Sequence, residues 1–416
     1  MNSVEKMDRL RNDSDELCRL DYYELTGYRC LGPMLLGMAE WLIDNVRKQN
    51  SHDIYFLARD GYIVKRAVDI LLSQLSVDDI HTHYLYGSRR MFGVPLLVNW
   101  NKYQDAINLF GPKPRIKAES FLKVMGLDDR TLPEYAIGHE CSNLDLSNDE
   151  VFQHLFVDFE DDIIANANDE FVHLKTYFKQ EGLFDVSDPI IVDIGWAGNL
   201  QTYLQEFGKL TNAPFANVHG YYLGLNNRAA RHPSNISFGY WFDYKRGDAD
   251  KAAPFRGLVE LFFSYSEGSA KRTVSVDGQE KPVLKEYEFS GSPDREKESK
   301  RLISIRDSAV RFVEKAAAEK LDTNNLPSSY CCSFLEELGY NPTKKDLAAF
   351  SGLLFEDSGE YLPLIPSEGN IRDIVKQFSS SQWKAGYLQK YMPLCTNWGK
   401  RLLDVRTFLN PFFGKF

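Results

Sequence analysis

The spacing of apolar residues changes several times along the first 100 positions. In residues 28–48 they recur every three or four positions, which predicts a buried amphipathic helix, at Leu31, Leu35, Met38, Leu42 and Val46. The short apolar run 54–58 then predicts a strand, and it is followed by a helical pattern from residue 63 and a second strand at 83–86. Two strands joined by one helix predict a βαβ unit and a parallel sheet.

The same alternation returns later in the chain. The apolar run 189–193 leads into a Gly-rich turn and a helix, and a further strand is predicted at 218–225. Asp277-Gly278 separates two β-like runs and predicts a hairpin turn. We therefore expect an α/β fold, with a Rossmann-like, mostly parallel sheet and active-site loops at the strand ends.

The remaining segments are predicted to be mainly helical. We expect residues 1–27 to form a helical leader, and residues 28–100 and 181–290 to form the catalytic core. Residues 101–180 are interpreted as a helical insertion between the two parts of the core. Residues 291–416 are predicted to form a mainly helical C-terminal region, with the polar stretch 290–299 as a linker.

Composition narrows the functional classes. The chain has 416 residues, of which 43% are hydrophobic, so a large core is expected. A net charge of −10 argues against a nucleic-acid binder. Six scattered cysteines and the lack of a signal-like start predict a reduced, cytoplasmic protein. Few histidines and no Cys-x-x-Cys pair make a zinc site unexpected.

The segment 378–416 is basic and aromatic, unlike the rest of the chain. It combines six Lys or Arg residues and one Asp with nine aromatic residues. Two interpretations stay open: a terminal helix docked on the body, or peripheral contact with the anionic inner face of the cytoplasmic membrane.

Three loops are predicted to meet at one edge of the sheet, because ligands of open parallel sheets bind beyond the carboxyl ends of the strands. The first, Arg59-Asp60-Gly61, offers a guanidinium, a carboxylate and a residue that permits close approach of a ligand. The second, Ser88-Arg89-Arg90, offers two more guanidinium groups. Each loop also has a purely structural interpretation, as a helix cap or a solvated turn.

The third loop carries the strongest signal. Asp193 ends a buried strand, and Gly195 and Gly198 free the backbone where a helix begins, which favours binding of an anion or a ribose. Trp196 either walls a sugar ring or packs, and Gln201 lies in the first turns of that helix. A fourth candidate, Glu260, lies among apolar residues, where a carboxylate needs either an ion-pair partner or a catalytic role.

Several familiar motifs are missing or incomplete. Asp193 is not followed by the second carboxylate of a haloacid-dehalogenase phosphatase, and neither a P-loop nor a Gly-x-Ser-x-Gly nucleophile is present. Asp248-Ala249-Asp250 has the D-x-D spacing of such a phosphatase but no preceding hydrophobic strand, and it leaves open the metal motif of a nucleotide-sugar glycosyltransferase. The Val192–Gly195 run also resembles a methyltransferase glycine motif, although Trp196 replaces the usual small residue.

The combined motifs resemble one bacterial family. The Leu31-Gly32-Pro33 helix, the three loops and Gln201 are similar, in order and spacing, to the glycan phosphoribosyltransferase domain of dual-domain ribofuranosyltransferases. Proteins of that family are often described as predicted haloacid-dehalogenase-type hydrolases, because the domain is fused to a phosphatase domain. The resemblance covers residues 28–98 and 188–268.

The resemblance implies a glycosyltransferase that moves 5-phosphoribose from 5-phosphoribosyl 1-pyrophosphate (PRPP) to a hydroxyl of a glycan acceptor. The acceptor is expected to be lipid-linked, in the synthesis of bacterial surface polysaccharides such as O-antigen or capsule. Charge development in this reaction calls for arginines and Mg²⁺ at the pyrophosphate and a carboxylate near the sugar.

The candidate roles follow from that chemistry. Arg59, Arg89 and Arg90, with Ser88, are assigned to phosphate groups. Asp193, Gly195, Trp196, Gly198 and Gln201 are assigned to the ribose or its 5-phosphate, beside Gly61 of the first loop. Asp60 is assigned either as the general base or as a Mg²⁺ contact, and Glu260 is the reserve base.

The chain departs from the fused pattern, because only about 27 residues precede the Leu31-Gly32-Pro33 helix. We therefore expect a separate phosphatase chain or a retained 5-phosphate. Two other functions stay open: an S-adenosylmethionine-dependent methyltransferase built on the Asp193 loop, and a non-catalytic scaffold of a polysaccharide assembly complex.

Overall fold

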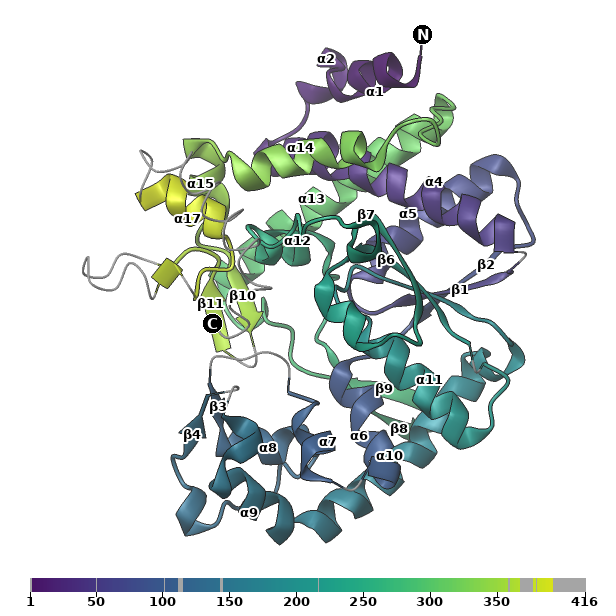
Figure 1. The fold of residues 1–416 in the computed structure, drawn as a ribbon. Coiled ribbons are helices and arrows are strands. Elements are labelled where there is room, and N and C mark those ends of the chain that lie inside the picture. The colour runs from purple at the N-terminus through teal and green to yellow at the C-terminus, as the bar shows by residue number, and fades with distance from the viewer. Residues whose placement is uncertain are drawn as a thin grey trace.

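The structure is a computed structural model that describes residues 2–49, 51–100, 102–110, 115–142, 145–215, 217–357, 360–366, 377–378 and 380–391. Its centre is a five-stranded, fully parallel sheet in the order β2-β1-β5-β6-β7 (Figure 1). These strands are β1 (Asp53–Leu57), β2 (His81–Leu85), β5 (Ile190–Asp193), β6 (His219–Leu225) and β7 (Ile236–Asp243). The predicted Rossmann-like α/β fold is confirmed.

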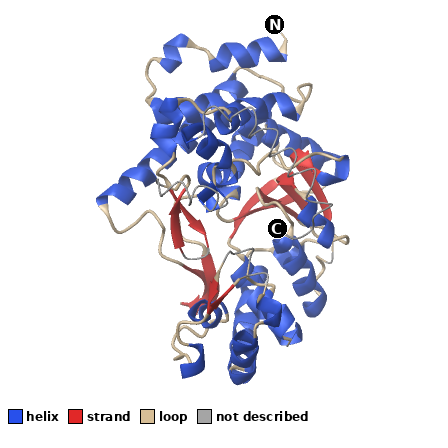
Figure 2. Ribbon diagram, turned by 60° about the vertical axis from the view of Figure 1, so that its left-hand side comes forward, coloured by secondary structure: helices blue, strands red, loops and turns tan. Residues whose placement is uncertain are grey.

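Helices cover both faces of this sheet, because alternate strand residues point to opposite sides. Ile54 and Phe56 of β1 pack in a core with the helices α4 (Gly32–Gln49), α5 (Gly61–Leu75) and α13 (Pro293–Ala318). Tyr55 and Leu57 pack in a second core with α6 (Arg89–Trp100), α10 (Glu160–Gln180) and α11 (Asn199–Thr211). The sheet is thus the middle layer of a three-layer sandwich (Figure 2).

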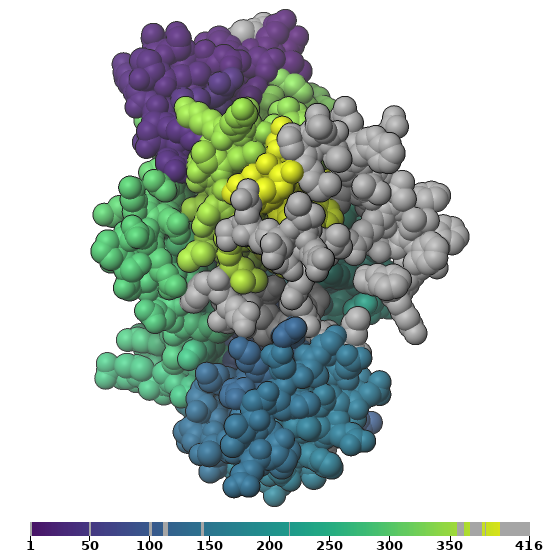
Figure 3. All heavy atoms as spheres, turned by 90° about the vertical axis from the view of Figure 1, so that its left-hand side faces the viewer, coloured from purple at the N-terminus to yellow at the C-terminus, as the bar shows by residue number. Residues whose placement is uncertain are grey.

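The segment interpreted as a helical insertion forms a lobe at the end of the molecule opposite the N-terminus (Figures 1 and 3). It contains α7 (Tyr103–Ile107), α8 (Ala118–Val124) and α9 (Glu150–Asp158), and an antiparallel pair of two-residue strands, β3 (Ile116–Lys117) and β4 (Glu140–Cys141). The long helix α10 leaves this lobe and packs on α6, which ties the lobe to the sheet.

The helices on either side of the α/β core in the sequence pack together. The leader forms α1 (Ser3–Arg11), α2 (Ser14–Leu17), α3 (Tyr22–Thr26) and a π-helical turn, η1 (Gly27–Leu31). The C-terminal region contributes α13, α14 (Ser328–Tyr340) and α15 (Lys344–Phe350). Helix α13 packs along α3, η1, α4 and α5, so Leu302 and Phe312 share one core with Leu35.

The predicted linker over residues 290–299 is wrong from residue 293 onward, because α13 begins there. The Ser292 side chain accepts a hydrogen bond from the Arg295 N–H, and Pro293 occupies the first turn. Serine before proline is a helix-start signal, which the sequence interpretation took for a linker.

The predicted hairpin is confirmed. Antiparallel strands β8 (Ala270–Val276) and β9 (Gln279–Leu284) are joined by Asp277 and Gly278, whose φ angles are 54° and 77°. Two consecutive positive φ values are typical of the tight turn that joins twisted strands.

The described part of segment 378–416 is docked on the body. Helix α17 (Lys384–Tyr391) follows a short hairpin of β10 (Leu354–Asp357) and β11 (Glu360–Pro363). Trp383 is fully buried and its Nε1–H donates to the Gly339 carbonyl at 2.8 Å, and Tyr387 is buried beside it. Residues 379 and 392–416 lie outside the described residues, and so does most of the predicted membrane contact. No helix of the described chain is long and apolar enough to cross a membrane.

Candidate active site

The strand order of the sheet has a topological switch point between β1 and β5. The chain passes from β1 to β2 on one side, and β5, β6 and β7 then extend the sheet on the other side. A crevice opens beyond the carboxyl ends of two such strands, and this is where parallel sheets bind ligands. Asp60 lies three residues after β1, and Asp193 is the last residue of β5. The two carboxylates therefore flank the switch point.

Asp60, Asp193 and Glu260 form one cluster, defined here as the carboxylate cluster. Burial raises the pKa of all three, and the charge of Asp60 raises it further at the other two. The pKa values of Asp193 and Glu260 both rise to about 7. Each side chain nevertheless remains partly exposed to solvent. A partly solvent-accessible cluster of carboxyl groups with raised pKa values is typical of acid–base sites.

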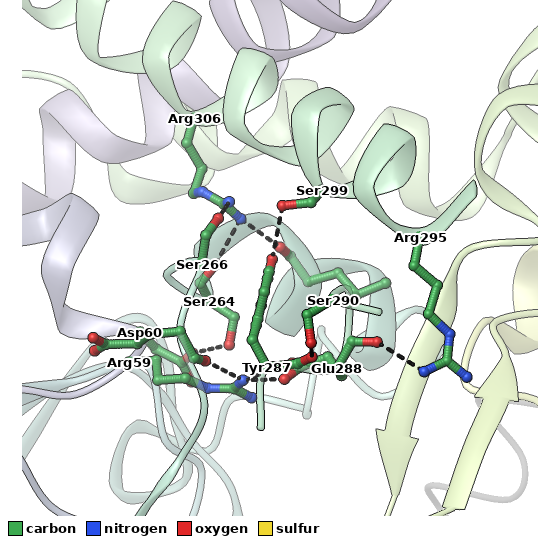
Figure 4. A network of polar contacts seen from close by, with 12 residues as sticks. Arg59, Asp60, Ser264, Ser266, Tyr287, Glu288, Ser290, Arg295, Ser299 and Arg306 are labelled. Atoms are coloured by element: carbon green, nitrogen blue, oxygen red, sulfur yellow. Dashed lines mark hydrogen bonds and ion pairs between the residues drawn. The ribbon is translucent and has the colours of Figure 1, made fainter. Parts of the chain in front are cut away.

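Asp60 is held from behind by the loop that follows α12 (Arg256–Phe263). The Ser264 hydroxyl donates to Asp60 Oδ1 at 2.6 Å, and Arg306 of α13 donates to the Ser264 carbonyl at 2.6 Å (Figure 4). Although Asp60 precedes α5, its side chain makes no capping hydrogen bond. The carboxylate is therefore fixed in place by Ser264 and does not act as a helix cap.

Asp193 lies over its own Gly-rich turn. The N–H groups of Ile194 and Gly195 donate to its carboxylate and lower its pKa, against the larger effect of burial. A Cβ atom at Gly195 would lie 2.5 Å from Asp193 Oδ2, and Gly198 has a φ of +73°, a conformation that favours glycine. Both glycines are required by the shape of this turn.

Glu260 reaches the cluster from α12. It accepts a hydrogen bond from Trp196 Nε1 at 2.7 Å. The indole of Trp196 stacks on Phe242, and the Arg256 guanidinium carbon lies 5.4 Å from the indole centroid. Trp196 thus connects the turn after β5 to α12 and sets the position of the Glu260 carboxylate.

Arg59 and Arg90 are occupied within the protein. Arg59 Nη1 donates to both oxygens of Glu288 at 2.6 Å, and Arg90 donates to both oxygens of Glu170 at 2.6 Å. Glu170 and Glu288 are buried. A buried carboxylate requires its cation, so these pairs belong to the framework. The geometry argues against the predicted phosphate-binding role of Arg59 and Arg90.

Other predicted binding residues make hydrogen bonds or close contacts that hold the fold together. The Ser88 hydroxyl donates to the Ala270 carbonyl at 2.6 Å and accepts from the Met91 N–H, at the start of α6. The fully buried Gln201 amide donates to the carbonyls of Val218 and Ile236, at 2.7 and 2.9 Å. A Cβ atom at Gly61 would press against the backbone of Phe56, at 3.0 Å. Neither Ser88 nor Gln201 directs its hydrogen bonds toward the carboxylate cluster.

Arg89 belongs to a group that sequence reasoning did not find. Burial lowers the pKa of Arg228, and the nearby charges of Arg256, Arg231 and Arg89 lower it further, against the opposing charge of Asp250. Arg89 and Arg256 also lower the pKa of Glu260. Arg89 and Arg256 therefore border the carboxylate cluster, and Arg228 and Arg231 lie near them; the four residues are called the arginine group. Arg228 and Arg231 lie in η5 (Asn227–Arg231), directly after β6, where the strand-end rule would have located them.

Part of the arginine group is free to bind a ligand. Arg256 forms an ion pair with Asp250, whose Oδ2 also accepts from Asn226. Within the part of the chain that the structure describes, the guanidinium groups of Arg89 and Arg228 make no hydrogen bond or ion pair, and both residues are exposed. Like charges gathered without a carboxylate partner favour binding of a polyanion.

The described residues can hold Mg²⁺ only together with the phosphate groups of a bound substrate. Among the described residues, no group of three or more His, Cys, Asp or Glu side chains is arranged to hold a metal ion. Magnesium in phosphate-transfer sites, however, is often held by one or two carboxylates and by the phosphates themselves. Asp60, with Ser264 as its hydrogen-bond partner, fits that role. Asp248 and Asp250 bind separate arginines, Arg246 and Arg256.

No family model matches the chain, and no curated protein matches its sequence.

Proposed function

We propose that this protein transfers 5-phosphoribose from PRPP to a hydroxyl of a glycan and releases pyrophosphate. One observation carries the proposal: three electrostatically coupled carboxylates lie near the switch point of the sheet, bordered by arginines of which Arg89 and Arg228 make no ion pair with any residue that the structure describes. A donor with a sugar at its centre and a diphosphate at one end matches that combination of charges.

The chemistry divides between the two groups. The bond between ribose C1 and the pyrophosphate oxygen breaks, and its electron pair leaves with the pyrophosphate. Arg89, Arg228 and Arg256 stabilise the charge that develops there, with Mg²⁺ supplying further neutralisation when bound. The acceptor oxygen bonds to C1, and its proton passes to Asp60, with Glu260 as the alternative base. Asp193 and its turn contact the ribose or its 5-phosphate.

The competing functions are less consistent with the site. S-adenosylmethionine carries a sulfonium cation, which the arginine group would repel. A scaffold would gain nothing from three carboxylates whose burial raises their pKa values, because such burial lowers stability. The proposed transfer step is the same whether the 5-phosphate is retained or is removed afterwards by a separate phosphatase chain.

The direct test is mass spectrometry of acceptor glycans after incubation with the protein, PRPP and Mg²⁺. A panel of methyl hexopyranosides and short bacterial oligosaccharides serves as acceptors, and pyrophosphate release is followed in parallel. The proposal predicts a mass gain of one phosphoribosyl group together with pyrophosphate. Absence of both products would contradict it, and a methyl-sized mass gain in a parallel incubation with S-adenosylmethionine would favour the methyltransferase.

A further inference from the structure

Four partly exposed tyrosines, called the tyrosine shelf, lie beside Asp60 of the carboxylate cluster: Tyr62, Tyr84, Tyr86 and Tyr265. Tyr62 is in the first turn of α5, Tyr84 and Tyr86 lie in and just after β2, and Tyr265 follows α12. The rings of Tyr62 and Tyr265 stack with centroids 3.9 Å apart. Tyr84 makes edge contacts with Tyr62 at 5.5 Å and with Tyr86 at 5.2 Å.

Glu267 fixes two members of the shelf. Its carboxylate accepts hydrogen bonds from Tyr84 Oη at 2.5 Å and from Tyr86 Oη at 3.0 Å. The backbone carbonyl of Glu267 is held in turn by Arg59 Nη1 at 2.9 Å. The rings are therefore ordered before any ligand arrives, which reduces the entropy cost of binding. This also gives Arg59 a defined role behind the site.

The shelf and the arginine group adjoin different carboxylates. The Tyr265 N–H donates to the carbonyl of Arg59, next to Asp60, whereas the charges of Arg256 and Arg89 act on Glu260. Arg89 follows β2, but its charge acts on Glu260 and Arg228. The negative charge of Asp60 adds to the effects of burial and Glu267 in raising the pKa of Tyr84, so the shelf adjoins Asp60.

Tyrosine clusters of this kind combine two modes of contact. Aromatic faces pack against the apolar C–H face of a pyranose ring, while phenol hydroxyls and a carboxylate bind sugar hydroxyl groups. A cluster that served only packing would not need four hydroxyl groups at partly exposed positions. No phosphate-binding cation belongs to the shelf, so it fits a neutral sugar better than the diphosphate.

We propose that the tyrosine shelf binds a pyranose residue of the glycan acceptor and thereby presents its hydroxyl to Asp60. This inference rests on the proposed function, since it names where the second substrate lies. It divides the edge of the sheet into a donor side at the arginine group and an acceptor side at the tyrosine shelf, with the carboxylate cluster between them.

Saturation-transfer NMR on the whole protein tests this directly, with methyl β-D-glucopyranoside, methyl β-D-galactopyranoside and methyl α-D-mannopyranoside as probes. We expect transfer to the ring protons of at least one probe. The signal should fall about 3- to 10-fold in Tyr265→Ala, and by less in Tyr265→Phe, which keeps the ring. The matched control is Tyr135→Ala: Tyr135 is 46% exposed on the distant lobe and should leave the signal unchanged.

Calorimetry with PRPP on the same variants separates this inference from the proposed function. Loss of pyranoside signal in Tyr265→Ala with unchanged PRPP affinity supports the shelf. If none of the probes receives saturation, or if Tyr265→Ala and wild type give equal signals, the shelf assignment is overturned, while PRPP binding by the wild type leaves the donor half of the proposal standing. Pyranoside binding without PRPP binding would instead remove the proposed function and keep the sugar site.

Discussion

Arg89 and Arg90 are adjacent in the chain, but the protein neutralises only one of them. Arg90 donates to both oxygens of the buried Glu170, whereas Arg89 is exposed and makes no ion pair within the described residues. The same contrast separates Arg59, paired with Glu288, from Arg228. Charge that the protein compensates belongs to the framework, and charge that it leaves open is available to a ligand.

The carboxylates divide in the same way. Glu170 and Glu288 each meet a guanidinium at 2.6 Å. In the carboxylate cluster, burial instead raises the pKa of Asp60, Asp193 and Glu260, and the charge of Asp60 raises it further at the other two. Uncompensated charge lowers stability, and proteins retain it mainly where catalysis or binding requires it. Substitutions in the two regions should therefore have opposite signatures.

The largest expected effect is on turnover in the carboxylate cluster. Asp60→Asn removes the proposed base and keeps the shape of the side chain. We expect phosphoribosyl transfer to fall about 10²- to 10⁴-fold, with PRPP affinity changed much less. Steady-state pyrophosphate release and calorimetry measure the two quantities. Full activity in Asp60→Asn would move the base to Glu260, which the corresponding Glu260→Gln variant would reveal.

In the framework, the largest effect should be on stability. Arg90→Ala leaves Glu170, whose side chain is 2% exposed, without its cation. We expect a loss of about 3–5 kcal/mol in the free energy of unfolding. Urea unfolding followed by circular dichroism measures it, with Arg89→Ala as the adjacent control, expected to change stability by less than about 0.5 kcal/mol. Equal effects at the two positions would remove the distinction between them.

A smaller effect on the free energy of unfolding, opposite in sign to that of Arg90→Ala, is expected for a substitution of Asp193. Its pKa rises from 3.8 to about 7 in the folded protein, so the native state binds a proton that the unfolded chain releases between those values. Stability is therefore lost as pH rises through about 7. Asp193→Asn should stabilise the fold by about 1–3 kcal/mol at pH 8 and by almost nothing at pH 4. The melting temperatures of Asp193→Asn and wild type at the two pH values measure this difference. A variant less stable than wild type at pH 8 would contradict the account.

Much of this architecture could be predicted from the sequence. Apolar runs that end at polar turns predict the strand before Asp60 and the strand that ends at Asp193. Because ligands of parallel sheets bind beyond the carboxyl ends of the strands, both residues were predicted to lie at one edge of the sheet. Glu260 was identified because a carboxylate among apolar residues needs a purpose. The same rule would have indicated Arg228, which follows the predicted strand 218–225 directly, had that turn been considered.

The partners of the arginines could not be predicted. Glu288 and Glu170 lie 229 and 80 residues from Arg59 and Arg90, and no local pattern links them. Gln201 was misleading for a similar reason, since its amide donates to the carbonyls of Val218, just before β6, and of Ile236, at the start of β7, which only the folded sheet brings near. The position of a residue after a strand predicts that it lies at the site. Only the folded structure shows whether a carboxylate already pairs with it or whether it can bind a ligand.

The most direct test of the central claim is a calorimetric titration of PRPP with Mg²⁺ into wild type and into the Arg89→Ala/Arg228→Ala double variant. The account predicts saturable binding below millimolar PRPP in the wild type. Removal of two charge-assisted contacts should weaken that binding at least about 10-fold without lowering the melting temperature. Absence of binding by the wild type at millimolar PRPP, or equal affinity in the double variant, would contradict it.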